Sequence, residues 1–290
     1  MSAALPPLRE VIARHGLSAR KGLGQNFLLD LNLTRRIARA AAPLEGHVIV
    51  EVGPGPGGLT RSLLEEGAGR IVAIEKDCRC IAALEEIAAA YPGRLVIVEQ
   101  DALTVDFAAI AEPPAKIVSN LPYNIATPLL VGWLKTEPWP PWYASMTLMF
   151  QKEVADRLTA PPGSKIYGRL SIIARWRTTV KPLFDVDRRA FTPPPKVTST
   201  LVQLVPVPVP EPACDIRYLE RVTAAAFGQR RKMLRTSLKG VTADPERLLE
   251  QAGISGDHRA EEIDVAGFCR LAAALADACE ADSKREGSGT

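Results

Sequence analysis

The chain has 290 residues, enough for one large domain or for a large domain with a small one. Its hydrophobic content of 47% suffices for a buried core, and a net charge of +3 is too small to indicate nucleic-acid binding by itself. No stretch approaches the ~20 consecutive apolar residues of a membrane span, and the N-terminus lacks a secretory signal pattern. The five cysteines lack metal-ligand spacing, so we expect free thiols, no metal site and a cytoplasmic protein.

A basic, glycine-containing loop is predicted between two N-terminal helices. The first helix is expected over residues 5–15, and Asp30 is expected to cap the second, over residues 31–41. The loop between them places two cations beside two glycines, which are Arg20, Lys21, Gly22 and Gly24. Such a loop is suited to face a ligand, and an ordinary solvated linker explains it equally well.

Four apolar runs with helical patterns between them predict a parallel α/β sheet. The runs cover residues 48–52, 70–74, 94–98 and 116–118. At or just beyond the end of each run stands a glycine or a polar residue, namely Gly53, Glu75, Asp101 and Asn120. Because open α/β sheets bind ligands at the carboxyl ends of their strands, these four residues are expected to share one site.

The first of these positions opens a glycine-rich turn, residues 53–58, before a helix. Strand, glycine turn and helix are typical of a nucleotide-binding βα unit, although one such turn is weak evidence alone. Glu75 lies near the ~20-residue spacing expected for an acid that binds ribose hydroxyls, and Asp77 is an alternative for that role. The carboxylate of Asp101 could accept from the amine of an adenine.

The fourth position begins the sequence Asn120-Leu121-Pro122-Tyr123-Asn124. Pro122 ends the strand because it cannot donate to a sheet ladder. Asn120 and the carbonyls of Leu121 and Pro122 could accept from an exocyclic amine, and Tyr123 could stack on a base. An ordinary strand-ending turn with a buried tyrosine is the alternative interpretation.

The remainder of the chain predicts an antiparallel edge on the sheet and then a second domain. A helix is expected from Pro128, a strand over 145–150, a helix over 151–158, and either a helix or a strand over 167–174. Strands around 176–186 and 198–206 flank a stiff loop, 191–197. Proline punctuation near 206–212 divides a catalytic domain, 1–208, from a small all-α domain, 209–279, and the tail, 280–290, is expected to be disordered.

The second domain carries the densest basic run, within a helix expected over residues 230–238. On that helix Arg231 and Arg235 would share a face suited to a phosphate backbone, and a solvated surface helix is the alternative. The RNA-binding candidates are therefore Arg20, Lys21, Arg230, Arg231, Lys232 and Arg235.

Taken together, these motifs resemble the family of 16S ribosomal RNA adenine N6,N6-dimethyltransferases, which use S-adenosylmethionine. The resemblance covers nearly the whole chain and includes the segments 22–28, 51–55, 120–124, 191–197 and 230–232. It implies a Rossmann-like methyltransferase sheet with helices on both faces, followed by a small all-α domain.

The resemblance also implies residue roles and a partner. The cofactor S-adenosylmethionine would contact Asn26, Leu28, Gly53, Glu75, Asp101 and Asn120. The target adenine would lie between Tyr123 and Phe191, with Asn120, Leu121 and Pro122 at its amine. The partner would be 16S rRNA within the small ribosomal subunit or its precursor, bound by a monomer with no membrane or metal involved.

Three other functions remain open at this stage. The same chemistry could act on 23S ribosomal RNA or on DNA, and the basic run after the proline linker favours the small subunit. The protein could instead be an assembly factor for which methylation is secondary. The glycine turn also formally matches the fingerprint of dinucleotide-dependent oxidoreductases.

Overall fold

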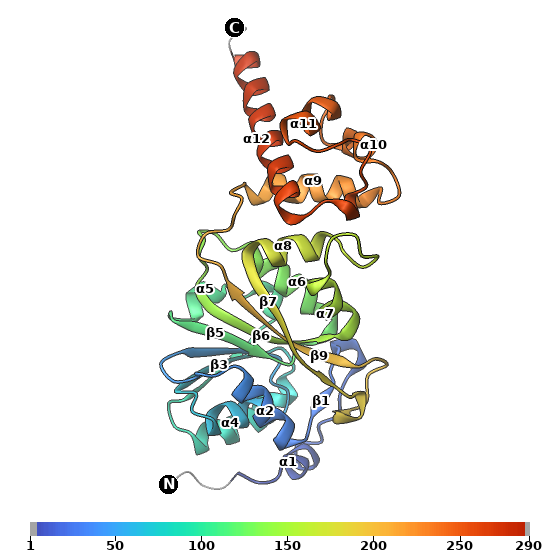
Figure 1. Ribbon diagram of the computed structural model, residues 1–290. Coiled ribbons are helices and arrows are strands. Elements are labelled where there is room, and N and C mark those ends of the chain that lie inside the picture. Colours follow the sequence, from blue (N-terminus) through green and yellow to red (C-terminus); the bar gives the residue numbers. More distant parts are fainter. Residues whose placement is uncertain (1–4, 288–290) are drawn as a thin grey trace. The chain divides into compact units, whose positions relative to one another are not determined.

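The computed structural model describes residues 5–287 and divides the chain into two compact units. The first unit contains residues 1–155 and 180–206, and the second contains residues 156–179 and 207–290 (Figure 1). The sequence predicts a single domain boundary near residue 208. The structure instead groups the segment 156–179 with the helices that follow residue 206.

The first unit is built on a seven-stranded sheet in the order β4-β3-β2-β5-β6-β9-β7. The strands β4, β3, β2, β5 and β6 pair in parallel, whereas β9 runs antiparallel to β6, which confirms the predicted antiparallel edge. The strand bounds are β2 Val48–Val52, β3 Arg70–Glu75, β4 Leu95–Glu99, β5 Ala115–Ser119, β6 Tyr143–Gln151, β7 Thr178–Val186 and β9 Ser199–Pro206. The α/β class predicted from the sequence is confirmed.

Helices alternate with the parallel strands, as the sequence periodicity predicts. Asp30 and Asp77 accept backbone hydrogen bonds at the starts of α2 and α4, which fixes where these helices begin. The helix bounds are α1 Leu8–Arg14, α2 Leu31–Ala40, α3 Gly58–Glu65, α4 Cys78–Ala90, α5 Phe107–Ile110, α6 Tyr123–Leu134 and α7 Lys152–Thr159. Short 3-10 turns are η1 Lys21–Leu23, η2 Ala102–Thr104 and η3 Arg188–Ala190.

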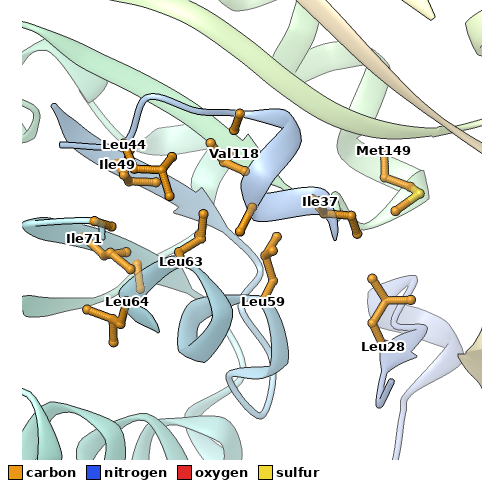
Figure 2. Close-up of a cluster of buried hydrophobic side chains, with 14 of the residues drawn as sticks. Leu28, Ile37, Leu44, Ile49, Leu59, Leu63, Leu64, Ile71, Val118 and Met149 are labelled. Atoms are coloured by element: carbon orange, nitrogen blue, oxygen red, sulfur yellow. The ribbon is translucent and has the colours of Figure 1, made fainter. Parts of the chain in front are cut away.

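A hydrophobic cluster packs α2, α3 and α4 against the sheet (Figure 2). Leu63 of α3 and Ile37 of α2 are fully buried in it, together with Ile49 of β2 and Ile71 of β3. The cluster fixes α3 relative to the strands, and α3 begins at the glycine turn. The position of the glycine turn is therefore set by the core.

A second, two-stranded sheet joins distant parts of the sequence. Its strands are β1, Phe27–Leu28, and β8, Phe191–Thr192, which pair antiparallel so that Leu28 lies opposite Phe191. The pairing brings the N-terminal glycine loop beside the start of the proline-rich loop. The sequence alone gives no sign of this pairing.

The second unit is all helical apart from the start of β7 and an isolated bridge, and its helices are joined by aromatic and apolar contacts. The bounds are α8 Arg169–Arg177, α9 Ile216–Gly228, α10 Leu234–Ser237, η4 Leu238–Gly240, α11 Pro245–Gln251, η5 Ala260–Glu262 and α12 Val265–Gly287. The ring of Phe227 on α9 lies 5.6 Å from that of Phe268 on α12 and 6.1 Å from that of Tyr167. The helix α12 continues to Gly287, into the segment expected to be disordered, and residues 288–290 lie outside the described part of the chain.

Candidate functional site

The carboxyl ends of β2, β3, β4 and β5 form the floor of a cleft in the first unit. Its lining comes from residues 22–28, from the glycine turn, and from the residues that follow each strand. The predicted residues that line it are Asn26, Leu28, Gly53, Glu75, Asp101, Asn120, Leu121, Pro122 and Tyr123. The strand ends therefore bring residues from Gly53 to Asn120 together in one cleft.

Two glycines in the turn after β2 allow the chain to pass close under its neighbours. Gly53 has a positive φ of +68°, and a Cβ there would lie 3.0 Å from the ring of Pro122. Gly55 has a φ of +56°, and a Cβ there would lie 3.1 Å from the ring of Phe27. Larger residues at these positions would be strained and would push into the cleft walls.

Glu75 stands at the end of β3 and is 6% exposed. Its Oε2 accepts from the backbone N–H of Gly55 at 2.9 Å, and its Oε1 accepts from that of Asp77 at 2.8 Å. Burial raises the pKa of Glu75, and the two backbone donors oppose that rise. Asp77, the alternative acid in the sequence, does not line the cleft, so the arrangement favours Glu75 for ribose hydroxyls.

Asp101 follows β4 and is held in place by two donors. Its Oδ1 accepts from the N–H of Leu103 at 3.0 Å, and its Oδ2 accepts from Lys76 Nζ at 2.6 Å. The bond from Lys76 and that from Leu103 lower the pKa of the carboxyl, which is therefore ionised at neutral pH. An ionised carboxylate at the cleft edge is suited to accept from an amine.

The amide of Asn120 has its nitrogen committed to the protein. Its Nδ2 donates to the backbone carbonyl of Asn26 at 3.1 Å, which leaves Oδ1 as an acceptor on a residue lining the cleft. The carbonyl of Pro122 accepts from the N–H of Ile125 at 3.1 Å, at the start of α6. Of the two backbone carbonyls predicted to meet an amine, that of Leu121 is therefore the better available.

Tyr123 is the first residue of α6, whereas the sequence analysis expected this helix to begin at Pro128. Its hydroxyl lies 2.6 Å from Ser199 Oγ, and Ser199 is fully buried on β9. Burial raises the pKa of the Tyr123 hydroxyl, so the phenol is neutral. Tyr123 therefore lines the cleft at the start of α6, and the contact with Ser199 holds its hydroxyl in place.

Phe191 occupies a place that the sequence analysis did not foresee. Its side chain is 1% exposed and belongs to the same hydrophobic cluster as Leu28, its partner in the two-stranded sheet. It is absent from the cleft lining, whereas Tyr123 is present. In this structure the side chain of Phe191 is therefore not accessible to a base.

Glu51 is a lining residue that the sequence analysis missed as a candidate. It is 2% exposed on β2, and its Oε2 accepts from Thr60 Oγ1 at 2.7 Å. Burial raises its pKa to about 8. The signal in the sequence is an acid inside a run of valines and isoleucines. Burying a carboxylate in a strand costs free energy, so an acid at such a position indicates a specific role.

The basic run of the second unit does not form the expected helix. Residues 229–232 form the turn between α9 and α10, so Arg231 and Arg235 do not share one helical face. Arg230 Nε donates to Glu261 Oε2 at 2.7 Å and its guanidinium also donates to the carbonyl of Ser164. Arg235 forms an ion pair with Asp257.

Arg231 and Lys232 are exposed on this turn, where they are accessible to a polyanion. Arg20 is exposed just before the cleft-lining segment, and the side chain of Lys21 lies outside what the structure describes. Among the described residues there is no helix long and apolar enough to span a membrane. Over the same part of the chain, no three acidic, histidine or cysteine residues are grouped as metal ligands.

Comparisons with known proteins agree with this geometry. Residues 16–277 match the family model described as ribosomal RNA adenine dimethylase. The chain is 64% identical over 272 residues to ribosomal RNA small subunit methyltransferase A of Azorhizobium caulinodans, covering 93% of each chain. It is 63% identical over 269 residues to the protein of the same name in Xanthobacter autotrophicus, covering 92% of this chain and 93% of that one.

Solved structures give the same picture of the fold. A dimethyladenosine transferase from Plasmodium falciparum aligns with a TM-score of 0.71 at 24% identity, over 83% of this chain and 94% of that one. The 23S rRNA methyltransferase ErmE aligns with a TM-score of 0.65 at 27% identity, over 87% of this chain and all of that one. The sheet is thus of the Rossmann-like methyltransferase type.

Proposed function

Because the chain belongs to the ribosomal RNA adenine dimethylase family, we propose that its cleft binds S-adenosylmethionine and methylates two adjacent adenosines of 16S rRNA. The adenosines lie in the 3′-terminal hairpin, and the products are N6,N6-dimethyladenosines. The observation that carries the proposal is the hydrogen bond from the Asn120 amide nitrogen to the carbonyl of Asn26, which leaves the amide oxygen of this lining residue available as an acceptor. The protein acts as a monomer in the cytoplasm, on the small subunit or its precursor.

The residues of the cleft fit S-adenosylmethionine. Gly53 and Gly55 line the cleft without side chains that would press on the rings of Pro122 and Phe27, so a ligand can lie close to the backbone of this turn. The carboxylate of Glu75 retains lone pairs for the ribose hydroxyls beyond its two backbone donors, and Asp101 accepts from the adenine amine. When bound, S-adenosylmethionine supplies a methyl group made electrophilic by the positive sulfur.

The chain's own residues hold the target amine for attack. The adenine leaves its stack and lies against the Tyr123 ring, with stacking worth roughly 1–3 kcal/mol per base. Asn120 Oδ1 and the Leu121 carbonyl accept from the two N6 hydrogens, which draws the nitrogen toward tetrahedral geometry and leaves its lone pair free. S-adenosylmethionine held by Gly53, Glu75 and Asp101 would supply the methyl group to this nitrogen, with its sulfur leaving as a neutral thioether.

No strong base is needed before this step. The methylated amine is acidic and loses its proton afterward, and one N–H remains for a second transfer. The protein thus contributes position and hydrogen-bond complementarity. Arg231, Lys232 and Arg20 are proposed to contact RNA phosphates, and the committed partners of Arg230 and Arg235 give these two a smaller part.

The variant Asn120→Ala tests this proposal, with the exposed Asn32→Ala as a control. We expect Asn120→Ala to lose methyl transfer by about 100-fold or more while still binding small subunits, because a lost polar contact at the reacting atoms has that magnitude. Wild-type activity in Asn120→Ala would contradict the assignment. Unimpaired subunit maturation by the inactive variant would favour an assembly role, and binding of a nicotinamide dinucleotide in place of S-adenosylmethionine would favour an oxidoreductase.

A further inference from the structure

Asp77 is buried beside the cleft without lining it. Its side chain caps the start of α4, because it accepts a hydrogen bond from the backbone N–H of Arg79 at 3.3 Å. Arg79 also donates through Nε to Oδ1 at 2.8 Å and through its NH2 nitrogen to Oδ2 at 2.5 Å. These contacts lower the pKa of Asp77 to about 2, so the carboxylate is charged at all working pH values.

The second partner of Asp77 comes from the N-terminal loop. Gln25 Nε2 donates to Asp77 Oδ2 at 2.9 Å, and Gln25 Oε1 accepts from the backbone N–H of Arg20 at 2.9 Å. Arg79 reaches the same loop, because its NH1 nitrogen donates to the carbonyl of Ser18 at 3.3 Å. Both ends of the segment 18–25 are therefore attached to one charged pair on α4.

This attachment is continuous with the proposed cofactor-binding residues. The backbone N–H of Asp77 donates to Glu75 Oε1 at 2.8 Å. Asn26 follows Gln25 directly, and its carbonyl accepts from the Asn120 amide. A displacement of Gln25 would thus move the partner that orients Asn120, although neither Gln25 nor Asp77 touches the reacting atoms.

We propose that Gln25 and Asp77 are positioning residues that hold the segment 18–26 over the cleft and thereby set the affinity for S-adenosylmethionine. We call this pair the Gln25–Asp77 latch. The proposed effect on the affinity for S-adenosylmethionine rests on the proposed function of the cleft. A loop with two glycines, Gly22 and Gly24, has high conformational freedom, and the latch limits that freedom before the ligand arrives.

The variants Gln25→Ala and Gln25→Glu separate the latch from simple packing. Alanine removes the bond, and glutamate keeps the size of glutamine but places a second negative charge against Asp77. If the latch acts as proposed, glutamate is at least as harmful as alanine. A packing role would instead let the isosteric glutamate rescue the alanine variant.

The first readout needs no ligand. Trypsin cleaves after Arg20 and Lys21, inside the segment, and cleavage after these residues requires the segment to open locally. We expect Gln25→Ala and Gln25→Glu to accelerate this cleavage about tenfold, the scale of a hydrogen bond to a charged group. Unchanged cleavage in both variants would overturn the proposal.

The second readout is the dissociation constant of S-adenosylmethionine, measured by calorimetry. We expect about a tenfold increase in Gln25→Ala and in Asp77→Asn, and no further increase in the double variant, because the two residues act through one contact. Additive effects would contradict the latch. Absence of binding by the wild-type protein would refute the proposed function, while the cleavage assay would still decide whether the latch exists.

The matched control is Asp215→Asn in the second unit. Asp215 caps α9 and pairs with Arg217 in the arrangement that Asp77 and Arg79 make on α4, without a glutamine partner among the described residues. Asp215→Asn should change stability as a lost cap does and leave both readouts at their wild-type values. An equal effect of Asp215→Asn on cleavage at Arg20 would assign the effect of the Gln25 variants to general destabilisation and overturn the proposal.

Discussion

The hydrogen bond between Tyr123 and Ser199 gives the sharpest prediction about the target-base pocket. The two hydroxyl oxygens lie 2.6 Å apart, and Ser199 is fully buried on β9 opposite Gln151 of β6. The variant Tyr123→Phe keeps the ring and removes its anchor. The variant Ser199→Ala keeps the tyrosine intact and removes the partner that holds it.

The expected magnitude follows from leaving one buried hydroxyl without a partner. That cost is about 1–3 kcal/mol. If it is expressed wholly in the placement of the ring, kcat/KM for RNA falls about 5-fold to 150-fold in each single variant. The double variant leaves no orphan hydroxyl, so we expect it to be no worse than the more damaged single variant and to show a coupling energy of at least about 1 kcal/mol.

The assay is a double-mutant cycle on kcat/KM for the RNA substrate at saturating S-adenosylmethionine, with unfolding in urea as a second measurement. Tyr143→Phe is the matched control, because the Tyr143 hydroxyl is also buried and donates to the carbonyl of Trp133 at 2.9 Å. Tyr143→Phe should lower the free energy of unfolding about as much as Tyr123→Phe does and should keep its activity. Additive single effects, or an equal loss of activity in Tyr143→Phe, would refute the reasoning.

Three further predictions concern residues whose surroundings the structure defines. Phe191→Ala should lower the free energy of unfolding by about 3–5 kcal/mol in urea titration, because this side chain is buried in the core, whereas a loss below about 1 kcal/mol would show that it does not reside there. Arg231→Ala should reduce the salt dependence of RNA binding by about one unit of slope without changing stability, and Arg230→Ala, which breaks the contact with Glu261, should do the reverse. The pKa of Glu51 is about 8 in the folded protein, above its unfolded value, so its contribution to stability is complete below about pH 4.5 and is lost as pH rises through 8. Glu51→Gln should abolish this pH dependence of the free energy of unfolding, measured across the same pH range.

The strand ends at the site could be predicted because each has a local signal. Short apolar runs that end at or just before Gly53, Glu75 and Asp101 predict parallel strands, and parallel strands place their carboxyl ends at one edge. The order of neighbours in the sheet and the pairing of β1 with β8 depend on contacts between distant residues. The burial of Phe191 follows from that pairing and has no local signature.

The start of α6 shows a local rule that the wider structure overrides. Proline is favoured in the first turn of a helix and disfavoured in its interior, which agrees with the expectation that the helix begins at Pro128. The helix begins five residues earlier, at Tyr123, with Pro122 before it and Pro128 inside. The carbonyl that Pro128 cannot satisfy belongs to Asn124, which lies at an exposed position where water can reach it.

The basic run shows the opposite case, because the sequence predicts a helix where the structure has a turn. The helix α9 ends at Gly228, and the chain turns so that Arg230 can reach Glu261 and the carbonyl of Ser164. An arginine in a basic run gives no sign of an acid 31 positions away. The three-dimensional structure is therefore needed to tell which basic side chains are exposed and which are paired with acids.

The central claim is methyl transfer from S-adenosylmethionine to the small ribosomal subunit, and one measurement tests it most directly. Small subunits isolated from cells that lack this protein are incubated with it and with tritiated S-adenosylmethionine, and the RNA is digested. We predict labelled N6,N6-dimethyladenosine from the two adjacent adenosines of the 3′-terminal hairpin of 16S rRNA. Label on 23S rRNA or DNA alone, or no label despite tight binding to the particle, would contradict the account.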